Sequence, residues 1–98
     1  MKKLLLTLAL LISAVSFGQT ADEYFDSAYE KAEAKDYYGA ISDFNKAIEL
    51  NPNYAMAYNN RSIAKESIGD LNGACEDARK AISLGNESSV KWVSDNCN

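Results

Sequence analysis

The strongest constraint on this chain is an internal repeat of 34 residues. When residues 21–54 are laid over residues 55–88, eleven positions are identical. The identical pairs are Ala21/Ala55, Tyr24/Tyr58, Lys31/Lys65, Asp36/Asp70, Gly39/Gly73, Ala40/Ala74, Asp43/Asp77, Lys46/Lys80, Ala47/Ala81, Ile48/Ile82 and Leu50/Leu84. A period of this length indicates stacked copies of one supersecondary unit, which bury their apolar faces against each other.

Each unit is predicted to be a pair of helices. In the first unit Ala40, Phe44 and Ala47 recur at three- and four-residue spacing, which places them on one helix face. Pro52 ends the first pair because proline cannot continue a helix, and Gly85 ends the second through a left-handed turn. The sequence therefore predicts an all-α fold with helices at 21–34, 37–50, 55–68, 71–84 and 87–96.

These residues resemble the tetratricopeptide repeat family. The segment GAISDFNKAIELNP is similar to the second half of such a repeat, and Tyr58, Ala74 and Ala81 match the pattern in the next unit. The later half of the second unit also resembles the related Sel1-like repeats. The resemblance implies a short solenoid of α-hairpins. Its parts would be repeat one at 21–54, repeat two at 55–86 and a capping helix at 87–96, whose Trp92 would point inward.

The first 18 residues have the three-part form of a secretory signal peptide. Lys2 and Lys3 precede an apolar run from Leu4 to Val15, and small residues stand at the minus-three and minus-one positions of a cut after Gly18. The run has 12 residues, whereas a membrane-spanning helix needs about 20. The sequence predicts cleavage of residues 1–18 and a bacterial domain, residues 19–98, in the periplasm or outside the cell, with no stable membrane insertion.

The composition argues against several classes of function. Removing Lys2 and Lys3 takes the net charge from −4 to −6, and an acidic chain is poorly suited to nucleic acid. The sequence has no His and only two Cys, which removes the commonest general base and leaves no zinc ligand set. We therefore expect no cofactor, no metal and no enzymatic activity.

Cys75 and Cys97 are predicted to form a disulfide. Export would place both thiols where oxidation is normal. Cys75 lies about ten residues before the turn at Gly85 and Cys97 about eleven after it, so the two reach similar heights on antiparallel helices. The rival interpretation is two unpaired thiols. A thiol-redox enzyme is disfavoured because there is no Cys-x-x-Cys motif.

The resemblance also implies where a partner would bind, because the first helix of each unit lines the concave surface in this family. The matching positions are Asp22, Phe25, Tyr29 and Glu33 in the first unit and Met56, Asn59, Ile63 and Glu66 in the second. The alternative for Phe25 and Tyr29 is that they only cover the exposed end of the array. One subset of the family grips a C-terminal carboxylate on this surface, but only Asn60 matches that pattern, so no such clamp is expected.

The sequence thus predicts a non-catalytic protein-interaction module exported across the inner membrane. Its partner would be a protein or peptide, itself an envelope or exported protein, that binds the concave face through apolar anchors or a basic patch. The alternative is a structural protein whose copies stack end to end and complete each other's short arrays.

Overall fold

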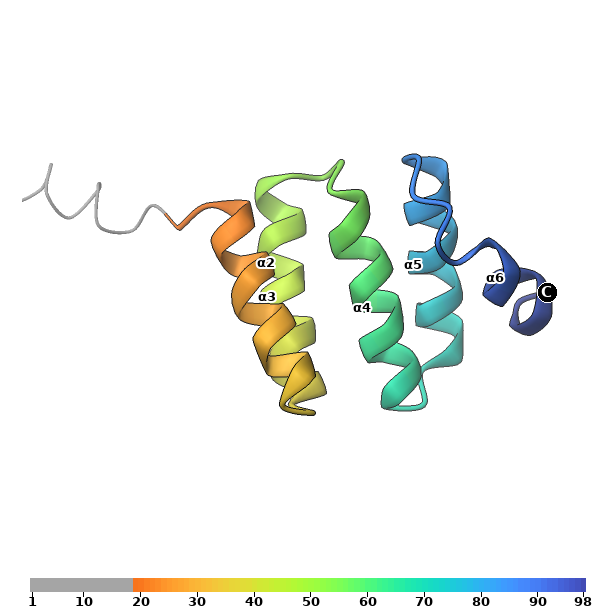
Figure 1. Cartoon of the computed structure of the whole chain (residues 1–98), viewed down its shortest axis with the longest axis horizontal. Coiled ribbons are helices and arrows are strands. Elements are labelled where there is room, and N and C mark those ends of the chain that lie inside the picture. Colours follow the sequence, from red (N-terminus) through yellow and green to blue (C-terminus); the bar gives the residue numbers. More distant parts are fainter. Residues whose placement is uncertain (1–18) are drawn as a thin grey trace, which may run out of the picture.

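The computed structural model describes residues 19–98, so the predicted signal peptide lies outside the described part of the chain. Five helices follow one another in these residues: α2 (Ala21–Glu33), α3 (Tyr37–Leu50), α4 (Ala55–Ser67), α5 (Leu71–Ser83) and α6 (Val90–Asn96). Figure 1 shows α2 with α3 and α4 with α5 as two neighbouring pairs, with α6 beyond α5 at the end of the row. The expected all-α hairpin solenoid with a closing helix is confirmed.

The start of the last helix differs from the expectation. The first four helices agree with the predicted ranges to within one residue, but the last begins at Val90 and not at residue 87. Asn86 accepts a hydrogen bond from the backbone N–H of Ser88 at 3.0 Å, and the N–H of Val90 donates to the carbonyl of Glu87 at 3.2 Å. The residues after the left-handed Gly85 therefore form turns, which delays the helix.

The second helix of each pair begins with the same cap. Asp36 accepts a hydrogen bond from the N–H of Gly39, and Asp70 accepts one from Gly73 at the same distance along its helix. These bonds satisfy backbone donors that a helix start leaves free. A Cβ at either glycine would collide with the capping carboxylate, so the repeat keeps the aspartate and the glycine together.

Small side chains bring the helices of each pair close together. Ala28, Ala40 and Ala47 are fully buried in the first pair and contact Phe44, the largest side chain that is completely buried. The second pair uses Ala74, Ala78 and Ala81 in the same way. Because Ala78 stands at the repeat position of Phe44, the second pair packs with little volume between its helices, and its interface relies on polar contacts as well.

The closing helix packs on α5 and buries none of its residues completely. Trp92 and Val93 are half-buried, so Trp92 is only partly covered and does not enter the core. Ser89 donates a hydrogen bond to the side-chain oxygen of Asn59 at 2.6 Å, which ties the turn before α6 to α4. The helix is therefore held to the array at a few points.

Candidate functional site: a groove between α2 and α4

A groove of about 400 Å³ lies between the first helices of the two units. Tyr29 and Glu33 come from α2, and Ile63 and Ser67 come from α4 at the same repeat positions, 34 residues further along. Tyr37, at the start of α3, and the buried Phe44 also line the groove. The remaining lining residues are Ala32, Asn60 and Ala64.

The groove lies in the C-terminal part of a longer surface that we call the inner stripe. On α2 the stripe consists of residues spaced at four, three and four positions, and on α4 it consists of their counterparts in the repeat, so each set lies along one side of its helix. The stripe comprises Asp22, Asp26, Tyr29 and Glu33 on α2 and Met56, Asn60, Ile63 and Ser67 on α4.

Three apolar side chains of the inner stripe are open to solvent. Tyr29 is 50 % exposed, Met56 54 % and Ile63 54 %. Single exposed apolar residues are common on protein surfaces, but here two of the three line one groove. This arrangement can accept an apolar side chain of a partner beside the polar groups of Asn60 and Ser67.

The prediction that Phe25 lies on the binding surface is wrong. Phe25 is only 9 % exposed and belongs to the core of the first unit. Its ring stacks on Tyr54 with the centroids 5.1 Å apart and meets Phe44 edge-on at 5.7 Å. Tyr54 precedes α4, so a residue from the connection between units covers Phe25, a contact that helical periodicity within α2 does not reveal.

The structure brings only part of the predicted partner-binding set together. Tyr29, Glu33 and Ile63 line the groove, whereas Asp22, Met56, Asn59 and Glu66 do not. Asp22 accepts a hydrogen bond from the Tyr54 hydroxyl at 2.6 Å, and Asn59 is occupied by Ser89. These two residues therefore have structural partners.

The binding surface predicted from the sequence did not include Tyr37, Ser67 or Asn60. Asn60 was considered there only as part of a carboxylate clamp. Ser67 could have been found, because it is the repeat counterpart of Glu33. Tyr37 begins a second helix, where the family pattern gives no signal for a lining residue.

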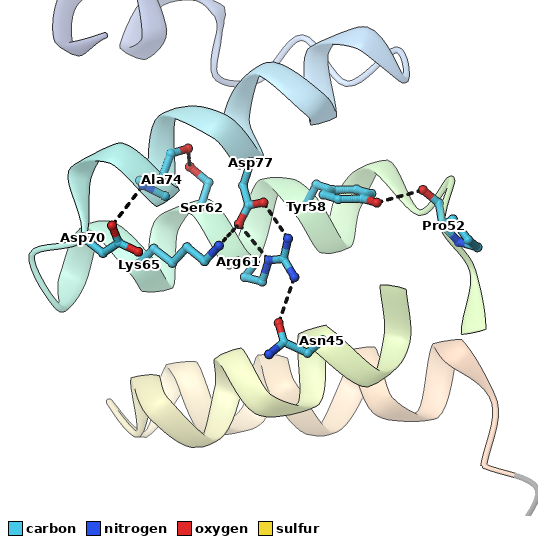
Figure 2. Close-up of polar contacts among 10 residues, drawn as sticks. Asn45, Pro52, Tyr58, Arg61, Ser62, Lys65, Asp70, Ala74 and Asp77 are labelled. Carbon is cyan, nitrogen blue, oxygen red and sulfur yellow. Dashed lines mark hydrogen bonds and ion pairs between the residues drawn. The ribbon is translucent and has the colours of Figure 1, made fainter. Parts of the chain in front are cut away.

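The basic residues of α4 are occupied by an aspartate of α5, as Figure 2 shows. Arg61 donates to both carboxylate oxygens of Asp77, and the Nζ atom of Lys65 lies 2.9 Å from one of them. Arg61 also donates to the side-chain oxygen of Asn45 on α3 at 2.8 Å, so one guanidinium connects the two units. Asp77 is only 4 % exposed, so this carboxylate lies between the helices and not on a solvated face.

The first unit has a simpler version of this contact. Lys31 and Ser27 both donate to Asp43, at 2.8 Å and 2.6 Å. Partial burial acts to raise the pKa of Asp43, but the hydrogen bonds from Lys31 and Ser27 outweigh it and lower that pKa below its usual value. The hydrogen bond to Asp43 in turn raises the pKa of Lys31. Lys31 and Lys65 thus each connect the two helices of a pair.

Tyr54 is the residue whose ionisation the fold changes most clearly. Burial and then the hydrogen bond to Asp22 raise the pKa of Tyr54 from 10.0 to about 12. The neighbouring carboxylate disfavours a phenolate, so the hydroxyl stays protonated to a higher pH than that of a free tyrosine. This contact fixes the connection between the units against the first turn of α2.

The two cysteines meet on the side of the array opposite the first unit. The structure joins Cys75 on α5 to Cys97 after α6, with the Cα atoms 5.9 Å apart. Their separation lies in the range that a disulfide requires. Oxidation of this pair in the exported protein stays a prediction, and the geometry is compatible with it.

Within residues 19–98 no group of three or more His, Cys, Asp or Glu side chains is arranged to hold a metal ion. The described helices are also each too short or too polar to cross a membrane.

The fold and the groove define a helical-repeat scaffold of the class that binds other proteins. Two models described as tetratricopeptide repeat match the chain, one over residues 24–54 and the other over residues 44–76. The chain belongs to the tetratricopeptide repeat family, and this membership supports a protein-interaction module.

Several relatives bear the family name. The chain is 48 % identical over 67 residues to a tetratricopeptide repeat protein 36 homolog from Nematostella vectensis, covering 68 % of this chain and 37 % of that protein. It is 49 % identical over 55 residues to tetratricopeptide repeat protein 36 of Danio rerio, covering 56 % and 29 %. It is also 42 % identical over 64 residues to human serine/threonine-protein phosphatase 5, covering 65 % and 13 %. The chain spans about a third of the length of the tetratricopeptide repeat protein 36 relatives.

Proposed function

We propose that this protein is an exported, non-catalytic interaction module that binds an extended or helical segment of another protein in the groove between α2 and α4. The observation that carries the proposal is the juxtaposition of half-exposed Tyr29 and Ile63 across a groove of about 400 Å³. Aromatic and aliphatic anchors of this kind supply most of the binding free energy in protein interfaces.

The rest of the site supports recognition of a polypeptide. The Asn60 amide offers both a hydrogen-bond donor and an acceptor within the groove, and a peptide backbone needs both. The Ser67 hydroxyl donates to the Ile63 carbonyl and can still accept a hydrogen bond from a partner. The walls belong to two helices joined to their partners by ion pairs, so the groove is largely preformed. A preformed site loses less entropy on binding.

The proposal that the protein is exported rests on the sequence of residues 1–18 and on the paired cysteines. The partner would then be another exported or envelope protein. The intact mass of the protein recovered from the envelope or medium should correspond to a chain that begins at Gln19. Recovery of a chain that retains Leu4 to Val15 would contradict export by cleavage.

The binding site is tested by screening a displayed peptide library against the protein and comparing two tyrosine variants. Tyr29→Ala should lose most of the selected binders, because the groove loses one wall. Tyr38→Ala is the matched control, since Tyr38 is 73 % exposed and lies outside the groove lining. Equal binding by the two variants would show that the groove is not the site.

The self-stacking alternative makes a different prediction. If copies complete each other's arrays, the mass measured by light scattering should rise with protein concentration, and truncation of Tyr29 should leave that rise unchanged. A monomer at all concentrations favours the interaction module.

A further inference from the structure

The charges of the inner stripe have a pattern that the apolar groove alone does not explain. The basic side chains of α2 and α4 are Lys31, Arg61 and Lys65, and each forms an ion pair with Asp43 or Asp77 between the helices of a pair. Asp43 and Asp77 balance two of these three positive charges, and all three cations contact carboxylates between the helices of a pair. They therefore contribute little to the face that a partner would meet.

The carboxylates of the same two helices are left in excess. Asp26, Glu33 and Glu66 are exposed and have no ion-pair partner among the described residues. Asp26 and Glu33 flank Tyr29 on the inner stripe, at three and four residues from it. The face thus has half-exposed apolar side chains at its centre and negative charge along the α2 side.

From this juxtaposition we infer that the partner segment is cationic and amphipathic: an apolar side chain enters the groove between Tyr29 and Ile63, and lysines or arginines on either side of it meet Asp26 and Glu33. The inference rests on the proposed function and specifies the partner's chemistry. Complementary charge would speed association and exclude acidic segments. The net charge of −6 for residues 19–98 acts in the same direction over longer distances.

The inference is tested with three fluorescent peptides of equal length that alternate Lys with Leu, Glu with Leu, and Lys with Ser. Binding to the protein is followed by fluorescence anisotropy at low and at physiological salt. The Lys–Leu peptide should bind at least tenfold more tightly than either of the others, because it alone has both the apolar anchor and the complementary charge. Its affinity should fall as salt is raised.

Paired variants locate the charge effect. Asp26→Asn combined with Glu33→Gln should weaken binding of the Lys–Leu peptide about tenfold, at up to about fivefold for each exposed charge pair. Glu76→Gln combined with Glu87→Gln changes the net charge equally at exposed positions outside the groove and should have little effect. Melting temperatures of both double variants should equal that of the original protein, which separates binding from folding.

The possible results separate the inference from the proposed function. Equal affinities for the Lys–Leu and Glu–Leu peptides, both lost in Tyr29→Ala, would overturn the inference and leave the groove as a peptide site. Tight binding of the Lys–Ser peptide that survives Tyr29→Ala would show non-specific attraction and would also overturn it. Self-association of the protein that blocks the Lys–Leu peptide and disappears in Tyr29→Ala would identify a second copy of the chain as the occupant instead.

Discussion

Arg61 holds both carboxylate oxygens of Asp77, through Nε at 2.7 Å and Nη2 at 2.6 Å. The Asp77 side chain is 6 % exposed and the Arg61 side chain 16 %, so the pair is largely removed from water. Asp43 has the corresponding place in the first unit, where its Lys31 partner is 42 % exposed. The same repeat position therefore carries a buried ion pair in one unit and a partly solvated one in the other.

This difference in exposure predicts that the same Asp→Asn substitution lowers the free energy of unfolding by different amounts in the two units. Asp77→Asn should lower the free energy of unfolding by about 3 kcal/mol, because it leaves Arg61 and Lys65 without a compensating charge. Asp43→Asn should cost markedly less, since water can solvate Lys31. Urea unfolding followed by circular dichroism measures both values. Similar losses in the two variants would show that burial does not set the strength of these contacts.

Phe25 and Tyr29 lie one helical turn apart and should respond in opposite ways to truncation. Phe25→Ala should lower the free energy of unfolding by about 3 kcal/mol, because the ring fills space between Phe44 and Tyr54. Tyr29→Ala should change stability little, since half of the side chain is already in water, but should abolish peptide capture. Thermal melts combined with the peptide assay distinguish the two effects. An unchanged free energy of unfolding for Phe25→Ala would show that Phe25 does not belong to the core.

The raised pKa of Tyr54 predicts that the protein loses stability at high pH. Its pKa is raised from 10.0 to about 12 in the folded protein, so folding favours the protonated phenol. The corresponding stabilisation is complete below pH 10 and is lost as the pH rises towards 12. Tyr54→Phe removes this pH-dependent stabilisation together with the hydrogen bond to Asp22.

The measurement is the melting temperature of the original protein and of Tyr54→Phe across that pH range. Tyr54→Phe should have a lower melting temperature than the original protein at neutral pH. The difference between the two melting temperatures should narrow as the pH rises from 10 towards 12. Tyr38→Phe, at an exposed position, should parallel the original protein throughout. A constant difference for Tyr54→Phe would argue that its ionisation is not linked to folding.

The disulfide predicted between Cys75 and Cys97 should have a local and a global effect. It closes a segment with a sequence separation of 22, which in the chain-entropy model stabilises by about 3 kcal/mol. Cys97→Ser should therefore melt lower, and hydrogen exchange should accelerate first in α6, which buries no residue completely. The amides of α2 and α3 serve as the internal control. Two alkylated thiols in the denatured, unreduced protein would exclude the bond.

The repeat made the architecture predictable, because both helix pairs follow from spacing within short segments. The contacts that were missed join segments far apart in the sequence. Phe25 was placed on the surface because its cover, Tyr54, comes from the next connection. The burial of Asp77 could not be predicted, because nothing local shows that Arg61 and Lys65 converge on it. Only part of the groove lining was predicted, because Tyr37 comes from α3, a helix outside the expected surface.

The position of Cys75 affects how a gene that encodes this array could gain further repeats. The first unit has Ile41 where the second has Cys75, so the thiol occurs only in the unit that adjoins the closing helix. Tandem duplication of residues 55–88 would produce two copies of Cys75. One copy would remain beside Cys97, and the other would lie inside the longer array as an unpaired cysteine. In an oxidising compartment that spare thiol would invite mispaired or cross-linked chains. A longer descendant would therefore need a second change, the loss of the inner cysteine, before selection could retain the added repeat.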